Sequence, residues 1–265
     1  MTDACVTSIA GGHLYDYPQY YDLVFGVGTS GECDFLQGCF DLHARRRVKR
    51  VFEPACGSGR LLIKLAQRGL DVSGCDLNRP SVDYCNRRFK RRGLRPAAFV
   101  ADIATISLPL KVDAAFNLLS SFQLLPNEHE AERHLAAMAR SLARGGLYIV
   151  GLHLMPSEGR RISAERWTAT RGRLSVCCRI WTRQLHRRRR QERCVMLSEI
   201  KTPGTRLRIE EELRFRTYSA LQLQRLFRKV REFDAVAIYD FTYDLFDPIS
   251  VGPETQDVVY VLRRR

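Results

Sequence analysis

The 265-residue sequence has little lysine, no CxxC pair and no long apolar segment. No stretch approaches the ~18 uninterrupted apolar residues of a membrane-spanning helix. Residues 1–17 also lack the basic segment and following apolar stretch of a signal peptide. We therefore expect no membrane partner and a cytoplasmic location.

The nine cysteines are an odd number and lack the spacing of a metal site. Cys177 and Cys178 fall in a β-rich segment, where adjacent side chains point to opposite faces. We expect reduced thiols and no metal ligands, in preference to a structural disulfide or a zinc site.

Acidic residues are outnumbered by basic ones, and the formal net charge is +14. Residues 160–216 hold 17 Lys and Arg, six Glu and no Asp, a net charge of +11. Such a patch can bind the phosphates of a nucleic acid. However, Arg outnumbers Lys by 37 to 6 along the whole chain, which favours a general arginine bias. Arg187–Arg190 fall in a predicted hairpin turn, where we expect a solvated surface.

Strand and helix patterns alternate up to about residue 153, which predicts an α/β fold with a mostly parallel, doubly wound sheet. Helices are expected near residues 33–45, 58–68, 80–92 and 128–143. Strands are expected near residues 50–53, 71–75, 97–101, 112–117 and 147–153.

From about residue 160, the residue pattern becomes typical of β-strands. RLSVCCRIW, RCVMLSEI and TRLRIEEELRFR are separated by HRRRRQ and KTPG, which are typical of hairpin turns. These segments predict an antiparallel meander inserted after the fifth strand. A helix near residues 217–230 and strands at 233–241 and 257–264 then complete the core.

The stretch VFEPACGSGR, residues 51–60, predicts a strand, a tight loop and the start of a helix. Leu62 occupies the third glycine position of G-x-G-x-x-G, and Glu53 would repel a diphosphate at the helix N-terminus. Both features disfavour an NAD-type oxidoreductase. Asp76 follows Gly57 by 19 residues, close to the ~20-residue offset of an acid that binds ribose hydroxyls. An adenosine ligand with positive charge and no phosphate, such as S-adenosylmethionine, would suit this pattern.

EPACGSGR followed by GCDLN resembles motif I and the following acid of class I S-adenosylmethionine-dependent methyltransferases. Four further segments resemble parts of that family in the same order, and the first is similar to enzymes that act mainly on small molecules. They are YDYPQYYDLVFG, VADI, FNLLSSFQLL and HLAAMARSLARGGLYIVGLHL.

The resemblance implies a Rossmann-like methyltransferase sheet with the antiparallel meander inserted in it. We expect a helical cap over the cofactor at residues 1–45 and the cofactor-binding core at 46–158. The inserted lobe should span residues 159–217, and the last helix and closing strands 218–265.

The resemblance also implies how the cofactor is bound. Asp76 should hold the ribose diol, Asp102 with Ile103 should contact adenine, and Glu53 should act toward the ammonium end. The expected cofactor-binding residues are Tyr21, Glu53, Ala55, Gly57, Gly59, Asp76, Leu77, Asp102, Ile103 and Asn117.

The expected acceptor pocket contains Tyr15, Phe122 and His153. His153 is the candidate general base because it follows a strand at the carboxyl edge of the sheet, where α/β sites lie. The alternative is a histidine that packs at a strand end without a role. An amine acceptor, which needs no strong base, is favoured because no His and carboxylate pair is evident in the sequence.

We therefore predict an S-adenosylmethionine-dependent methyltransferase that acts on nitrogen or oxygen of a small molecule. Asn117–Ser120 lack the prolines and aromatic residue of the N-P-P-Y-like motif in enzymes that methylate base amino groups. The alternatives are a nucleic-acid methyltransferase that uses the basic lobe, and a cofactor-binding protein without turnover.

Overall fold

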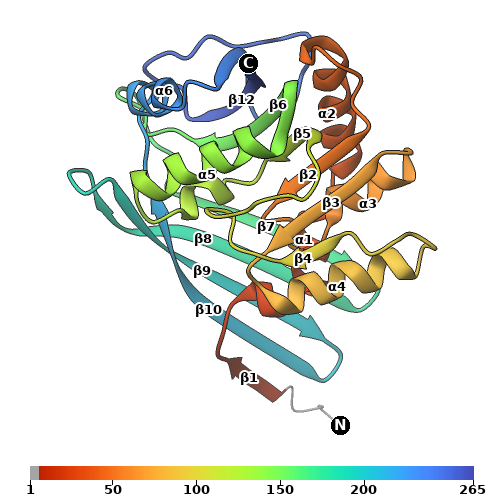
Figure 1. The fold of residues 1–265 in the computed structure, drawn as a ribbon. Coiled ribbons are helices and arrows are strands. Elements are labelled where there is room, and N and C mark those ends of the chain that lie inside the picture. The colour runs from red at the N-terminus through yellow and green to blue at the C-terminus, as the bar shows by residue number, and fades with distance from the viewer. Residues whose placement is uncertain (1–5) are drawn as a thin grey trace.

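The computed structural model describes residues 6–265, so Cys5 lies outside the described residues. Seven strands form one sheet, and all are parallel except β12, which is antiparallel to both of its neighbours (Figure 1). This arrangement confirms the predicted doubly wound α/β fold. In spatial order the strands are β4 (Ala98–Val100), β3 (Asp71–Asp76), β2 (Arg50–Pro54), β5 (Val112–Asn117), β6 (Leu142–His153), β12 (Asp257–Arg264) and β11 (Phe233–Tyr239).

Helices cover both faces of this sheet, which explains why every residue of β5 is buried. One face packs against α2 (Thr29–His43), α3 (Arg60–Gln67) and α4 (Arg79–Lys90). The other face packs against α5 (Glu128–Ser141) and α6 (Ala220–Lys229). No helix in the described part of the chain is long and apolar enough to cross a membrane.

A second sheet forms the inserted lobe, as predicted, but with more strands than the sequence indicated. Its antiparallel strands are β7 (Ala164–Arg171), β8 (Leu174–His186), β9 (Gln191–Thr202) and β10 (Thr205–Arg216), and β1 (Val6–Ala10) runs parallel to β10. β7 and β1 were not predicted from the sequence. The predicted helical cap is therefore not helical throughout, because its first described segment extends the lobe sheet.

The lobe has an apolar inner face that packs on α1 (Pro18–Phe25). Val176, Cys178 and Ile209 are fully buried there, whereas the neighbouring Cys177 is partly exposed. The two adjacent cysteines therefore face opposite sides of β8, and both are free thiols.

The chain leaves and re-enters the core at neighbouring positions. Leu154 and Tyr218 form a parallel bridge, and the Met155 amide donates to the Tyr218 carbonyl at 2.8 Å. The short helix η2 (Ser121–Leu124) supports the same junction through Gln123. The Gln123 side chain donates to the carbonyl of Arg216 at 3.1 Å and accepts from the amide of His153 at 2.9 Å.

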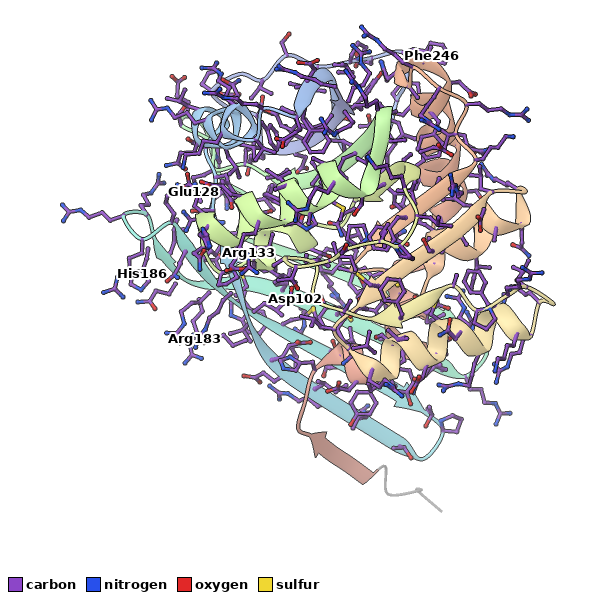
Figure 2. All side chains as sticks on the ribbon, viewed as in Figure 1. Asp102, Glu128, Arg133, Arg183, His186 and Phe246 are labelled. Atoms are coloured by element: carbon purple, nitrogen blue, oxygen red, sulfur yellow. The ribbon has the colours of Figure 1, made fainter. Side chains whose placement is uncertain are left out.

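The arginine-rich turn between β8 and β9 differs from the prediction at one residue. Arg187–Arg189 are exposed, and Figure 2 shows Arg183 and His186 projecting away from the doubly wound sheet at this end of the lobe. Arg190 instead turns back, donates to Glu128 at 2.5 Å and lies over the ring of Tyr218. The expectation of four solvated arginines is therefore wrong for Arg190, because Glu128 at the start of α5 offers it a partly buried partner.

Replacing Arg190 by Ser should lower the free energy of unfolding by about 1–2 kcal/mol, because it breaks a partly buried ion pair between the lobe and α5. Arg216 and Lys229 also contact Glu128, which limits the loss. Arg189→Ser is the matched control and should change stability by less than about 0.5 kcal/mol. Urea denaturation measures both, and equal stability of the two variants would contradict the assignment.

Candidate active site

Three residues of the loop between β2 and α3 have a left-handed backbone conformation, and contacts with the next strand hold this loop in place. Ala55, Gly57 and Gly59 have φ angles of 57°, 51° and 68°. The carboxylate of Asp76 accepts the amide of Gly57 at 2.8 Å and the amide of Asn78 at 2.9 Å. These bonds fix the loop against the end of β3.

A cavity of about 680 Å³ opens at this carboxyl edge of the sheet. We call it the cofactor cavity. All of the predicted cofactor-binding residues except Gly59 line it: Tyr21, Glu53, Ala55, Gly57, Asp76, Leu77, Asp102, Ile103 and Asn117. Gly59 lies at the start of α3, where an added Cβ would be 2.3 Å from Sγ of Cys85. Its glycine is required for close packing, and it does not contact the cavity.

Two buried polar atoms in the cofactor cavity have no hydrogen-bond partner among the described residues. They are Oε2 of Glu53 and Oδ1 of Asn117, whose Nδ2 donates to the carbonyl of Pro54 at 2.7 Å. Burial raises the pKa of Glu53 well above its ordinary value, and the nearby Arg60 only partly opposes this. When Glu53 is ionised, both atoms are acceptors, and a cationic donor group would partner them and favour the ionised form.

Arg60 and Glu32 form a buried bidentate ion pair beside this cavity, which the sequence analysis did not identify. Each side chain is at most 10% exposed. The cation of Arg60 is therefore already engaged by Glu32, and Glu53 has no direct ion-pair partner among residues that the structure describes.

His134 fixes the segment after β4 that contains Asp102 and Ile103. Its Nδ1 lies 2.8 Å from the Ile103 carbonyl, and its Nε2 lies 2.8 Å from the hydroxyl of Tyr148. Burial lowers the pKa of His134 to about 4, so the ring is neutral at ordinary pH. The carbonyl can only accept, so Nδ1 carries the proton and Nε2 accepts from Tyr148.

A second cavity, of about 310 Å³, lies between the inner face of the lobe and the ends of β5 and β6. We call it the acceptor cavity. It shares four lining residues with the cofactor cavity: Tyr15, Tyr21, Leu119 and Leu124. The two cavities therefore adjoin, and the tyrosines of the N-terminal segment stand at their boundary.

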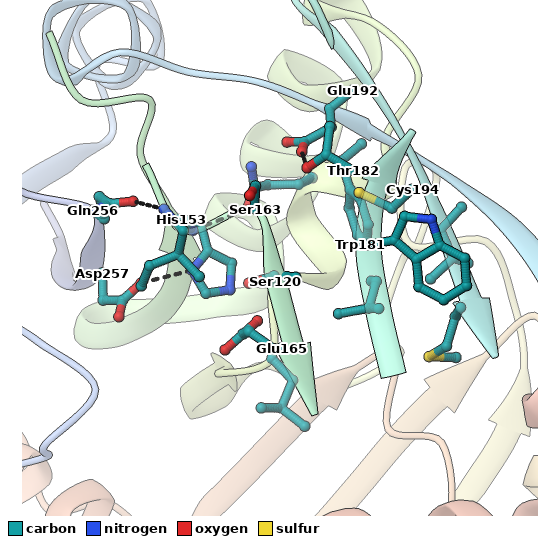
Figure 3. A pocket seen from close by; sticks show the side chains of 18 of the residues that line it. Ser120, His153, Ser163, Glu165, Trp181, Thr182, Glu192, Cys194, Gln256 and Asp257 are labelled. Carbon is teal, nitrogen blue, oxygen red and sulfur yellow. Dashed lines mark hydrogen bonds and ion pairs between the residues drawn. The ribbon is translucent and has the colours of Figure 1, made fainter. Parts of the chain in front are cut away.

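His153 lines the acceptor cavity, and the structure pairs it with a carboxylate (Figure 3). Its Nδ1 lies 2.7 Å from Oδ1 of Asp257 on the adjacent strand β12. Burial alone lowers the pKa of His153, but the hydrogen bond and charge of Asp257 and the charge of Glu165 outweigh it, so the pKa is raised. Nε2 is left without a hydrogen bond to any described residue.

Phe122, the third residue predicted for the acceptor pocket, does not line it. Helix η2 turns this ring into the core, where it is 1% exposed and packs between His134 and Tyr218. Tyr15 does line the pocket, as expected.

Comparison with known proteins bears on the domain that carries the cofactor cavity. A family model described as a methyltransferase domain matches residues 51–146. These residues are thus similar to a methyltransferase domain, in agreement with the resemblance of their motifs to class I S-adenosylmethionine-dependent methyltransferases. The demethylmenaquinone methyltransferase of Thermus thermophilus is 28% identical to this chain over 142 residues. That match covers 52% of this chain and 63% of the relative.

Solved structures resemble nearly the whole chain, at identities that show the fold alone. An S-adenosylmethionine-dependent methyltransferase from Clostridium acetobutylicum has a TM-score of 0.76 and 16% identity, over 94% of this chain and 97% of that one. A sugar N-methyltransferase from Streptoalloteichus has a TM-score of 0.72 and 17% identity, over 100% and 98%. The lobe is therefore part of an architecture that occurs in other methyltransferases.

The family model and the name of the Clostridium acetobutylicum enzyme make S-adenosylmethionine the ligand to compare with this cavity. Its positive charge and donor groups suit the unpartnered acceptors on Glu53 and Asn117. The cofactor cavity thus has hydrogen-bond acceptors that suit the donor groups of this molecule.

Replacing Asp76 by Ala should weaken S-adenosylhomocysteine binding at least about tenfold, since hydrogen bonds to a charged group are worth about 1.5–3 kcal/mol each. The variant also loses the partner of the Gly57 amide. Asp71→Ala, at the exposed opposite end of β3, is the control and should bind as the wild type does. Titration calorimetry compares them, and unchanged affinity in Asp76→Ala would remove Asp76 from the cofactor site.

Proposed function

We propose that this protein transfers the methyl group of S-adenosylmethionine to nitrogen or oxygen of a small molecule held in the acceptor cavity. The observation that carries the proposal is the wall of Tyr15, Tyr21, Leu119 and Leu124 that both cavities share. Methyl transfer needs the acceptor and the cofactor aligned at a common boundary with water excluded.

The cofactor, when bound, supplies an activated methyl group on a sulfonium. Asp76 is proposed to bind the ribose diol, and Asp102 with Ile103 the adenine edge. Glu53 and Asn117 are proposed to accept from the ammonium end, because both present buried acceptors without partners among the described residues. His134 keeps Ile103 in place through its carbonyl.

His153 is proposed as the base that takes the proton of the acceptor. With Nδ1 donating to Asp257, a neutral His153 presents the lone pair of Nε2, while Asp257 fixes the tautomer and stabilises the protonated ring. This His and carboxylate pair removes the reason for expecting an acceptor that needs no base.

The character of the acceptor cavity supports a small molecule over a nucleic acid. Arg161 is the only Lys or Arg among the described residues that line it, and it is paired with Glu192 at 2.6 Å. Several lobe arginines outside the cavity also have carboxylate partners, such as Arg179 with Glu199. Two similar proteins are named as a demethylmenaquinone methyltransferase and a sugar N-methyltransferase, and these names also support a small-molecule acceptor.

Titration calorimetry should show binding of S-adenosylhomocysteine and none of NAD. Isotope-labelled methyl groups from S-adenosylmethionine should then enter the small-molecule fraction of a cell extract, and its RNA should stay unlabelled. Labelled RNA, with loss of the label in an Arg187–Arg189 triple Ser variant, would favour the nucleic-acid alternative. Binding without any transfer would favour a cofactor-binding protein that lacks turnover.

His153→Ala should lower turnover about 10²-fold or more, the usual worth of general-base assistance, with unchanged S-adenosylhomocysteine affinity. In the wild type, the rate should rise with pH through a raised His153 pKa, above the ordinary ~6.5, because only the neutral ring accepts a proton.

Asp257→Asn removes the charge that raises this pKa, so the rising limb should move to lower pH. Single-turnover rates across pH measure both effects. An unchanged rate in His153→Ala would leave this histidine a packing residue at the strand end.

A further inference from the structure

We propose that Glu165 makes the acceptor cavity selective for a cationic amine, whose ammonium group its carboxylate binds. This inference rests on the proposed function and adds the substrate class to it.

Glu165 lies on the face of β7 that looks toward the core. It is two residues from Trp167, which packs with the inner face of the lobe, and it pairs in register with Ile180 of β8, which packs there too. This face is otherwise largely apolar, and the acceptor cavity opens on it. Glu165 is therefore a carboxylate placed among apolar neighbours at the edge of the lobe sheet.

The other charged groups that line the acceptor cavity are already paired. Glu192 accepts from Arg161 and Thr182, and Asp257 contacts His153 (Figure 3). Glu165 has no hydrogen bond or ion pair with any residue in the described part of the chain. When all of these groups are ionised, the cavity carries one uncompensated negative charge.

That uncompensated charge is partly solvated in the free protein, because the Glu165 side chain is exposed. Partial desolvation by the neighbouring protein nevertheless raises the pKa of Glu165, and the charge of His153 offsets this only in part. A ligand that covers Glu165 removes its carboxylate from water, so that ligand must supply an opposite charge or hydrogen bonds. The hydroxyl of Ser120, unlike the exposed carboxylate of Glu165, is buried at this cavity without a partner among the described residues.

An ammonium group meets these requirements better than a hydroxyl or an acid. A charge-assisted hydrogen bond is about twice as strong as a neutral one, and an anionic acceptor would be repelled. The aromatic walls add to this preference, since Phe25 packs against Trp167 at 5.3 Å and Phe241 against His153 at 5.2 Å. Cations are attracted to such ring faces.

His153 provides the base that a bound ammonium group needs before it can react. An ammonium nitrogen cannot attack, because its lone pair is held in an N–H bond. When Nε2 of neutral His153 takes that proton, the electron pair of the bond stays on nitrogen, and the imidazolium is stabilised by Asp257 and Glu165. Glu165 therefore holds the amine and His153 makes it nucleophilic.

The test compares two probes of nearly equal shape, benzylamine and benzyl alcohol, titrated by NMR into protein saturated with S-adenosylhomocysteine. The wild type should bind the amine at least about tenfold more tightly, the worth of one charged contact. Glu165→Gln keeps the side-chain shape and should abolish this preference while it retains affinity for S-adenosylhomocysteine.

Glu199→Gln is the matched control. It removes a carboxylate of the same lobe that is paired with Arg179 and does not line the cavity, so the preference for the amine should remain. Equal affinity for the two probes, no measurable binding of benzylamine, or a preference that survives in Glu165→Gln would overturn the inference. Failure of S-adenosylhomocysteine to bind the wild type would instead overturn the proposed function.

Discussion

The carboxylate of Asp76 accepts hydrogen bonds from the amides of Gly57 and Asn78, and the carboxyl edge of the sheet depends on these two bonds. Gly57 belongs to the loop after β2, and Asn78 caps α4 after β3. One side chain therefore sets the distance between two strand ends and the direction of two helices. Burial raises the pKa of Asp76, while the amides that donate to it act in the opposite sense. The same oxygens that order the loop thus lie beside the space where the ribose is proposed to bind.

Features encoded by short spacings could be predicted from the sequence. The strand, loop and helix at residues 51–67, the acids at strand ends and the change to a β-rich lobe all depend on neighbours within about 20 residues. Contacts between distant segments could not be predicted. His153 and Asp257 are 104 positions apart, and Arg190 finds Glu128 62 positions away. Phe122 was misplaced for a related reason, since the direction of its ring depends on the turn of η2.

The two adjoining cavities are similar in the charged groups that line them. Each contains a carboxylate, Glu53 in one and Glu165 in the other, that has no direct ion-pair partner among the described residues, although arginines are abundant elsewhere in the chain. Nearby cations are already engaged, Arg60 by Glu32 and Arg161 by Glu192. Glu53 is buried, and an unpaired buried acid lowers the stability of the free protein; a cation that pairs with it returns that stability on binding. Fold stability and ligand affinity are thus linked at Glu53, whereas the exposed carboxylate of Glu165 stays solvated until a ligand covers it.

The bridge between Leu154 and Tyr218 has a consequence for how such a protein can diversify. The lobe is a loop whose two ends already touch, so its length and sequence place no demand on the order of the seven strands. Exchange of the segment between these residues would change most of the lobe's contribution to the acceptor cavity and leave the glycine loop and its acids in place. The cofactor cavity can therefore stay the same among such proteins while the lobe that lines the acceptor cavity varies.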